Sequence, residues 1–244
     1  CVNSEKYRER AAALAEQMAL RYKDYPGLVA WHVANEYSTF CHCENCEKKF
    51  RVWLKKKYGT TEELNKRWNT SFWGRTVYDF DTIMLPTERN DDDKFFPAKQ
   101  LDYQRFVTDT TEECFLNEAN VLRKITPDIP VFSNISGFIK KLNQFQLTRN
   151  MDIVGWDNYP SPKDDAAFPA LKHDIMRGLK DGASYMVAEQ SPNQQNWQPY
   201  NKLKRPGEAR LLAYQGIAHG ADSSLYFQMR QSVGGQEKFH GAII

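Results

Sequence analysis

The sequence predicts an α/β fold with parallel strands and, within that class, a (β/α)8 barrel. Helical patterns alternate along the 244 residues with short apolar runs rich in β-branched and aromatic residues, as expected for βα units on a parallel sheet. Each apolar run ends in polar or aromatic residues, and barrel enzymes build their active sites at these carboxyl ends of the strands. An open doubly wound sheet usually carries a glycine-rich phosphate loop after one strand, and the sequence contains none.

The first half of the chain is mostly helical. Residues 3–23 form an amphipathic pattern that a Tyr-Pro-Gly turn ends, and residues 28–34 (LVAWHVA) are predicted to form the first strand. Helices are expected at residues 47–58 and 61–68. The following stretch, residues 69–97, is irregular and polar, and long loops of this kind are more often functional than accidental.

Four further strands follow in the second half, after a long helix at residues 100–124. These strands are predicted at residues 131–133, 152–156, 185–188 and 223–227, with helices between them at residues 139–148, 173–180 and 209–219. All five strands end in a polar or aromatic cluster: Asn35-Glu36, Asn134, Asp157-Asn158-Tyr159, Glu189-Gln190 and residues 228–230. The carboxyl ends of the strands are therefore the predicted site.

The composition counts against two classes of partner. The formal net charge is only +2, with 26% charged residues, so electrostatics favour no nucleic-acid partner. No apolar stretch approaches the roughly 20 residues of a membrane span, so no membrane partner is expected. Aromatic residues make up 13% of the chain, and several tryptophans, among them Trp73 and Trp197, lie in polar stretches. They either anchor loops or line a sugar-binding cleft, and composition alone does not decide between these readings.

Two glutamates, Glu36 and Glu189, stand at strand ends, where a carboxyl group would point into the mouth of a barrel. Glycoside hydrolysis needs such a pair, because one carboxyl must protonate the leaving oxygen while the other attacks or activates water. Asn35, just before Glu36, fits a residue that holds the 2-OH of the sugar. The alternative is that each glutamate caps the following helix or pairs with a lysine.

Three cysteines, Cys41, Cys43 and Cys46, lie within six residues. This spacing suits tetrahedral Zn²⁺ better than a set of buried or disulfide-linked cysteines. A fourth ligand must come from elsewhere, and the candidates are Cys1, Cys114, His42 and Glu44. A site made of cysteines alone has no open coordination position, so the metal would be structural rather than catalytic.

Motifs along nearly the whole chain resemble glycoside hydrolase family 42 β-galactosidases. They are WHVANEY at residues 31–37, the cysteine loop, FRVWLKKKYGTTEELNKRWNTSFWG, WDNYP, AEQSPNQQNWQPYN, AYQGIAHGAD and YFQMRQSVGGQEKFHGA. The resemblance implies a retaining β-galactosidase that removes terminal non-reducing β-D-galactose by double displacement. Its partner would be a β-galactoside, and no organic cofactor is expected.

The resemblance also assigns roles to individual residues. It implies Glu36 as acid/base at the end of barrel strand four and Glu189 as nucleophile at the end of strand seven. The residues implied to contact galactose are Asn35, Trp197, Glu237 and His240, with Trp73 lining the cleft from its own or a neighbouring subunit and Tyr159 hydrogen-bonding the nucleophile. The family's structural zinc site corresponds to Cys1, Cys41, Cys43 and Cys46, leaving Cys114 out.

The same resemblance implies that residues 1–244 are one catalytic TIM-barrel domain cut at both ends. They would cover about strands 4 to 8, without strands 1–3 or the C-terminal domains. The parent protein is expected to be a homotrimer in carbohydrate metabolism, cytoplasmic as in bacteria, with secretion left open. Two rival functions are a non-catalytic, zinc-stabilised carbohydrate-binding module, which would not need both glutamates, and another retaining barrel glycosidase, against which the cysteine loop counts.

Overall fold

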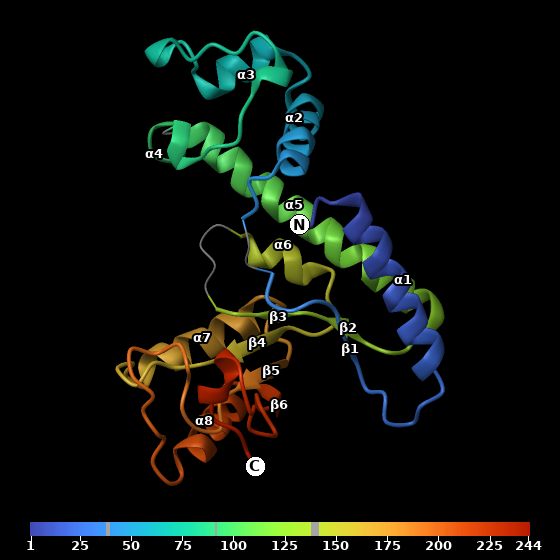
Figure 1. Ribbon diagram of the computed structural model, residues 1–244, viewed down its shortest axis with the longest axis vertical. Helices are drawn as coiled ribbons and strands as arrows, with labels where there is room; N and C mark the ends of the chain where they lie inside the picture. The colour runs from blue at the N-terminus through green and yellow to red at the C-terminus, as the bar shows by residue number, and fades with distance from the viewer. Residues whose placement is uncertain (38–39, 91, 138–141) are drawn as a thin grey trace. The chain divides into compact units, whose positions relative to one another are not determined.

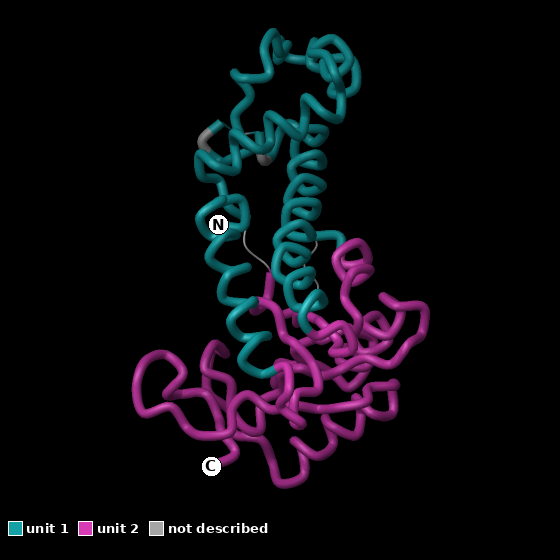
Figure 2. The backbone as a smooth tube through the Cα atoms, turned by 90° about the vertical axis from the view of Figure 1, so that its right-hand side faces the viewer, with its two compact units in different colours: residues 1–22, 38–125, 140–143 teal, residues 23–37, 126–139, 144–244 magenta. Residues whose placement is uncertain are grey.

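The computed structural model describes residues 1–37, 40–90, 92–137 and 142–244 (Figure 1). The chain forms two compact units, drawn in teal and magenta in Figure 2. The first unit comprises residues 1–22, 38–125 and 140–143, and the second comprises residues 23–37, 126–139 and 144–244. All strands of the described residues belong to the second unit.

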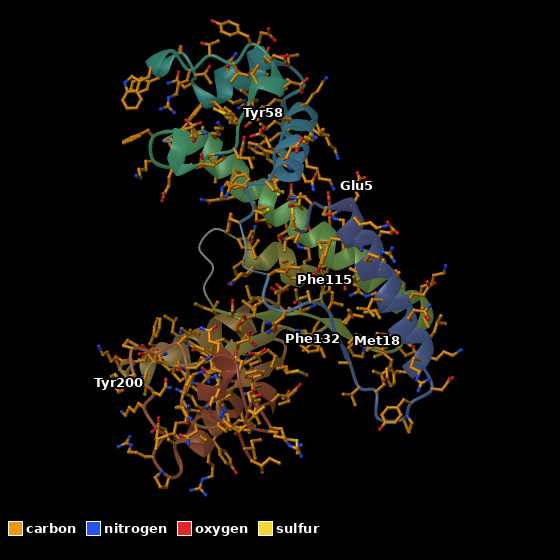
Figure 3. The ribbon with its side chains drawn as sticks, in the orientation of Figure 1. Glu5, Met18, Tyr58, Phe115, Phe132 and Tyr200 are labelled. Atoms are coloured by element: carbon orange, nitrogen blue, oxygen red, sulfur yellow. The ribbon has the colours of Figure 1, made fainter. Side chains whose placement is uncertain are left out.

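The first unit is helical. Its α-helices are α1 (Glu5–Tyr22), α2 (Glu44–Tyr58), α3 (Thr61–Trp68), α4 (Asp92–Phe95) and α5 (Pro97–Ile125), with 3₁₀ turns at Phe72–Gly74, Phe80–Thr82 and Glu88–Asn90. Helix α1 lies along α5 in both ribbon and tube views, with the small residues Ala15 and Ala19 buried. Phe115 on α5, labelled in Figure 3, is fully buried in this unit.

Local chemistry sets the boundary between α2 and α3. Helix α2 ends at Gly59, whose φ of 73° is accessible to glycine at little steric cost. Thr60 then caps α3 by accepting a hydrogen bond from the Glu63 backbone N–H at 3.3 Å. Asp102 on α5 joins these helices, because its buried carboxylate accepts hydrogen bonds from Trp68 Nε1 at 2.9 Å and from Lys57.

The second unit contains a parallel sheet. Strand β1 (Trp31–His32) pairs with β2 (Val131–Phe132), and after Ser133 the chain continues as β3 (Asn134–Ile135). Strands β3, β4 (Gly155–Asn158), β5 (Tyr185–Gln190) and β6 (Ala221–Ser224) are hydrogen-bonded in that order, all parallel. The connections contain α6 (Gln144–Arg149), α7 (Ala167–Gly178) and α8 (Glu208–Ala218). The carboxyl ends of these strands therefore meet at one edge of the sheet.

The core of the second unit lies between the strands and α7. Its buried cluster is made of Ile135, Val154, Trp156, Met176, Leu179, Tyr185, Val187 and Ala221. Gly155 begins β4 at a close approach, because a Cβ there would come within 2.8 Å of the Phe132 ring. Strand β4 is buried at all four positions, whereas β5 has buried and partly exposed positions along its length.

The predicted alternation of strands and helices is confirmed, with differences at the boundaries. The predicted strand 28–34 shortens to Trp31–His32, and beyond its carboxyl end the backbone turns to positive φ at Ala34. The last strand lies at Ala221–Ser224 rather than at residues 223–227. Residues 139–141 of the predicted helix 139–148 lie outside the described residues, and α6 begins at Gln144. Among the described helices, none has both the length and the apolar character needed to cross a membrane.

Candidate active site

Three carboxyl groups converge at the carboxyl ends of the strands in the second unit. Glu36 follows β1, Asp157 lies in β4 and Glu189 lies in β5. One carboxylate oxygen from each lies within 4.8 Å of the others. Asp157 is buried, whereas Glu36 and Glu189 keep partial access to solvent. The two glutamates singled out in the sequence are thus brought together, and a third carboxyl joins them.

Asn134, at the start of β3, connects these groups. Its Oδ1 accepts a hydrogen bond from the Glu36 backbone N–H and lies 2.9 Å from His32 Nε2. Its Nδ2 lies 2.9 Å from Asn35 Oδ1, 2.9 Å from Asp157 Oδ2 and 3.3 Å from Glu189 Oε1. The Asn134 side chain is only 2% exposed, and through these contacts it holds its neighbours in position.

The backbone at Glu36 is held in an uncommon conformation. Glu36 has a φ of 48° and Ala34 a φ of 57°, both in the left-handed region that non-glycine residues rarely occupy. The hydrogen bond from the Glu36 N–H to Asn134 holds this turn. Strained residues persist where the surrounding contacts over-determine them, which is frequent at functional sites.

Tyr159 contacts the second glutamate. Its hydroxyl donates a hydrogen bond to Glu189 Oε2 at 2.8 Å. Burial raises the pKa of Glu189, whereas the hydroxyl of Tyr159 opposes this rise because it stabilises the ionised carboxylate. Burial and the neighbouring Glu189 charge also raise the pKa of Tyr159, so the phenol remains a donor.

The remaining predicted sugar contacts of this unit form an aromatic group beside Tyr159. The ring of Trp197 lies 4.8 Å from that of Tyr159 and 5.2 Å from that of His240. His240 Nε2 lies 3.0 Å from the Phe227 carbonyl, which can only accept, so Nε2 carries the proton. The opposite nitrogen, Nδ1, is buried without a hydrogen-bond partner and lies 3.8 Å from Glu237 Oε2.

Close backbone packing holds the loop that carries Trp197. The Gly241 N–H donates to the Gln194 carbonyl at 2.9 Å. A Cβ at Gly241 would come within 2.6 Å of Asn193 Cβ and 2.9 Å of Gln194 N. The position therefore requires glycine, and it ties the Trp197 loop to the segment that follows His240.

The four predicted metal ligands converge in the first unit. Cys1 Sγ lies 3.5 Å from Cys43 Sγ and 3.4 Å from Cys46 Sγ, and the latter two sulfurs are 3.8 Å apart. Cys41 completes the cluster, in which all four sulfurs lie within 4.8 Å of one another. Four thiols so arranged can hold a metal ion. Burial raises the pKa of Cys46 to about 12, so a cation would be needed to ionise this thiol at neutral pH.

Trp73 belongs to the first unit, whereas the other predicted sugar contacts belong to the second. It is 66% exposed, has a φ of 57°, and packs against Phe72, Phe95 and Arg75. Its predicted place in the cleft stays a prediction.

Three residues of the site had no role in the sequence-based prediction: His32, Asn134 and Asp157. Asn134 and Asp157 did stand in the polar clusters at strand ends, which is the signal that points to them. Their importance lies in the pairing of β3, β4 and β5, which brings the three strand ends to one place.

Comparisons with known proteins agree with this architecture. The family model for glycoside hydrolase family 42, described as Beta-galactosidase, matches residues 1–244. The chain is 51% identical to the β-galactosidase BgaP of Planococcus sp. and 43% identical to the β-galactosidase bgaB of Geobacillus kaustophilus. All of the chain is covered in both alignments, but it spans only 37% of either relative.

A solved structure gives the same result. The crystal structure of the β-galactosidase from Bacillus circulans sp. alkalophilus is similar to the whole chain with a TM-score of 0.97 and 52% identity, over 37% of that structure's length. The resemblance found in the sequence motifs is therefore confirmed. The chain belongs to glycoside hydrolase family 42.

Proposed function

We propose that this chain carries the catalytic pair of a retaining β-galactosidase, which removes terminal β-D-galactose in two displacement steps. The observation that carries the proposal is the approach of Glu36 and Glu189, whose nearest carboxylate oxygens lie within 4.8 Å. Retaining enzymes hold their two carboxyl groups about 5–5.5 Å apart, whereas inverting enzymes need roughly 6.5–9.5 Å to admit a water molecule. The short separation favours retention.

In this proposal Glu189 is the nucleophile. Its carboxylate attacks the anomeric carbon while Tyr159 donates to Oε2, which leaves Oε1 as the attacking atom. Asn134 Nδ2, 3.3 Å from Oε1, orients that oxygen. Burial of Glu189 removes water that would otherwise weaken its attack on the sugar.

Glu36 is the acid and then the base. It protonates the leaving oxygen in the first step and deprotonates the attacking water in the second. Its backbone N–H is held by Asn134, and the same amide holds Asn35 Oδ1. One buried side chain therefore sets both the acid/base and the residue proposed to bind the 2-OH.

The aromatic group supplies the proposed galactose platform. Trp197 is half exposed, so its face is free to stack on the C–H face of a pyranose ring. Glu237, whose side chain is 48% exposed, offers a carboxylate acceptor to sugar hydroxyls, and the unpaired Nδ1 of buried His240 lies 3.8 Å from that carboxylate. Tyr159 joins this platform to the nucleophile.

The cysteine cluster is proposed to hold a structural Zn²⁺. With sulfur–zinc bonds of about 2.3 Å, a tetrahedral site has sulfur–sulfur edges of about 3.8 Å. The distances of 3.4, 3.5 and 3.8 Å among Cys1, Cys43 and Cys46 fit this edge. They are far too long for disulfides. Cys1, Cys41, Cys43 and Cys46 would bind the ion, and Asn3 Nδ2 would donate to the Cys46 sulfur.

The parallel strands are further proposed to be strands 4 to 8 of a (β/α)8 barrel in a longer, cytoplasmic protein. The order β1-β2 and β3-β4-β5-β6, with helices between, supports this reading. Thiols are kept reduced in the cytoplasm, which favours that compartment for a cysteine cluster. Exposed Phe72, Trp73 and Phe95 would suit a subunit contact in a homotrimer.

Hydrolysis of a nitrophenyl β-galactoside tests the function. Glu189→Gln in the whole protein should lower kcat by at least about 1,000-fold while galactose still binds. Glu62→Gln, on the exposed face of α3, is the matched control and should leave kcat unchanged. A wild-type protein that binds galactose but hydrolyses none of these substrates would instead be a carbohydrate-binding module.

A further inference from the structure

Asp157 is a buried carboxyl group that the catalytic roles above do not use. Its side chain is only 3% exposed. Oδ2 accepts a hydrogen bond from Asn134 Nδ2 at 2.9 Å. The other oxygen, Oδ1, is buried without a hydrogen-bond partner. Burying an acceptor without a donor costs free energy, so the surroundings of Asp157 disfavour its ionised form.

The groups that face Asp157 make its ionised form still less favourable. Glu36 after β1 and Glu189 in β5 each place a carboxylate oxygen within 4.8 Å. Tyr159 is an uncharged phenol, and His32 reaches Asp157 only through the shared amide of Asn134. Carboxylates that share a site in this way retain a proton, because like charges so close cannot all ionise. Asp157 is the most buried of the three and is therefore the group that retains it.

Burial, followed by the charge of Glu189, raises the pKa of Asp157 to about 9. Glu36 adds to this rise in pKa, and one of its carboxyl oxygens lies within 4.8 Å of an Asp157 oxygen. Two ionised carboxylates cannot form a hydrogen bond with each other because neither has a hydrogen. A proton on Asp157 gives Oδ1 the partner that it otherwise lacks.

We propose that Asp157 is a positioning residue, protonated throughout turnover, whose Oδ1–H donates to one carboxylate oxygen of Glu36. The inference rests on the proposed roles of Glu36 and Glu189. The bond orients the Glu36 carboxyl so that its other oxygen faces the glycosidic bond. The proton given to the leaving group is the one on Glu36, and Glu36 regains a proton from the attacking water. The proton of Asp157 stays in place in both steps.

Two substitutions in the whole protein separate this role from others. Asp157→Asn keeps a neutral side chain with one donor and one acceptor, and should keep kcat/KM within about tenfold of wild type. Asp157→Ala removes the donor and should lower kcat about 10–100-fold with little change in KM, as expected for a lost hydrogen bond to a charged group. Equal, severe losses in both variants would mean that the carboxylate itself is needed, and full activity in both would remove the positioning role.

An infrared measurement locates the proton without relying on activity. At pH 7 the wild-type spectrum should contain a protonated-carboxyl band that Asp157→Asn lacks and that disappears as the pH is raised past about 9. No such difference band would overturn the proposal even if Asp157→Ala failed to fold. A wild-type protein inactive on galactosides would refute the proposed function, whereas the band would still report on Asp157.

Discussion

Replacing Tyr159 by phenylalanine should move the acidic limb of the pH–rate profile. The Tyr159 hydroxyl donates to Glu189 Oε2 at 2.8 Å and stabilises the ionised carboxylate of this proposed nucleophile. A hydrogen bond to a charged group contributes about 1.5–3 kcal/mol. At about 1.4 kcal/mol per tenfold change in an equilibrium constant, its loss makes ionisation of Glu189 about 10–100-fold less favourable and so raises the pKa of Glu189. Because the proposed nucleophile must be ionised to attack, the acidic limb should shift to higher pH.

The assay is kcat/KM for a nitrophenyl galactoside across pH, which reports on ionisation in the free enzyme. At pH values on the acidic limb, Tyr159→Phe should lose about 10–100-fold, and the loss should shrink as the pH rises. Tyr200→Phe is the matched control, since Tyr200 is 57% exposed on the same unit (Figure 3). A loss that is equal at every pH, with the limb unmoved, would refute the link between Tyr159 and the ionisation of Glu189.

Three further outcomes follow from the structure. Cys46→Ser should lower the amount of zinc bound per chain, measured by atomic emission. Cys114→Ser should not, because Cys114 lies outside the cluster of four thiols. Equal zinc content in the two variants would contradict the assigned ligands. Burial lowers the pKa of His173 from 6.5 to about 4. The folding stability that this neutral, buried histidine contributes above pH 6.5 is therefore lost as the pH falls towards 4. Over this pH range, Tm should decline less in His173→Gln than in the wild type. Gly241→Ala should lower kcat/KM, because the added Cβ would clash with the backbone of the Trp197 loop. Gly234→Ala is the control and should leave kcat/KM unchanged, because a Cβ there meets nothing within 4 Å. Equal effects of the two substitutions would mean that the packing of the Trp197 loop does not affect catalysis.

Much of the site could be predicted because its chemistry stands at strand ends. Glu36 and Glu189 each follow an apolar run, and the convergence of parallel strand ends then implies that they meet. The cysteine spacing likewise pointed to a metal loop, although from the spacing alone the fourth ligand stayed open between Cys1 and other candidates. The structure places Cys1 Sγ 3.4 Å from Cys46 Sγ.

What escaped prediction depends on register and burial, which a single sequence does not display. Asn134 and Asp157 look like other polar residues until β3 pairs with β4 and directs one amide towards five neighbours. Strand limits were also missed: β1 ends at His32 although the local sequence favours a longer strand, and positive φ follows at Ala34. Tertiary contacts therefore decide these features.

The central claim is the division of labour between the two glutamates, and the stereochemistry of azide rescue tests it most directly. In Glu189→Ala, azide can enter from the face that the nucleophile vacates, so the product should be the inverted α-galactosyl azide. In Glu36→Ala, a dinitrophenyl galactoside should still form the intermediate on Glu189, and azide attack should give the retained β-galactosyl azide. The opposite pairing of variants and products would mean that the two roles are exchanged and would contradict the account.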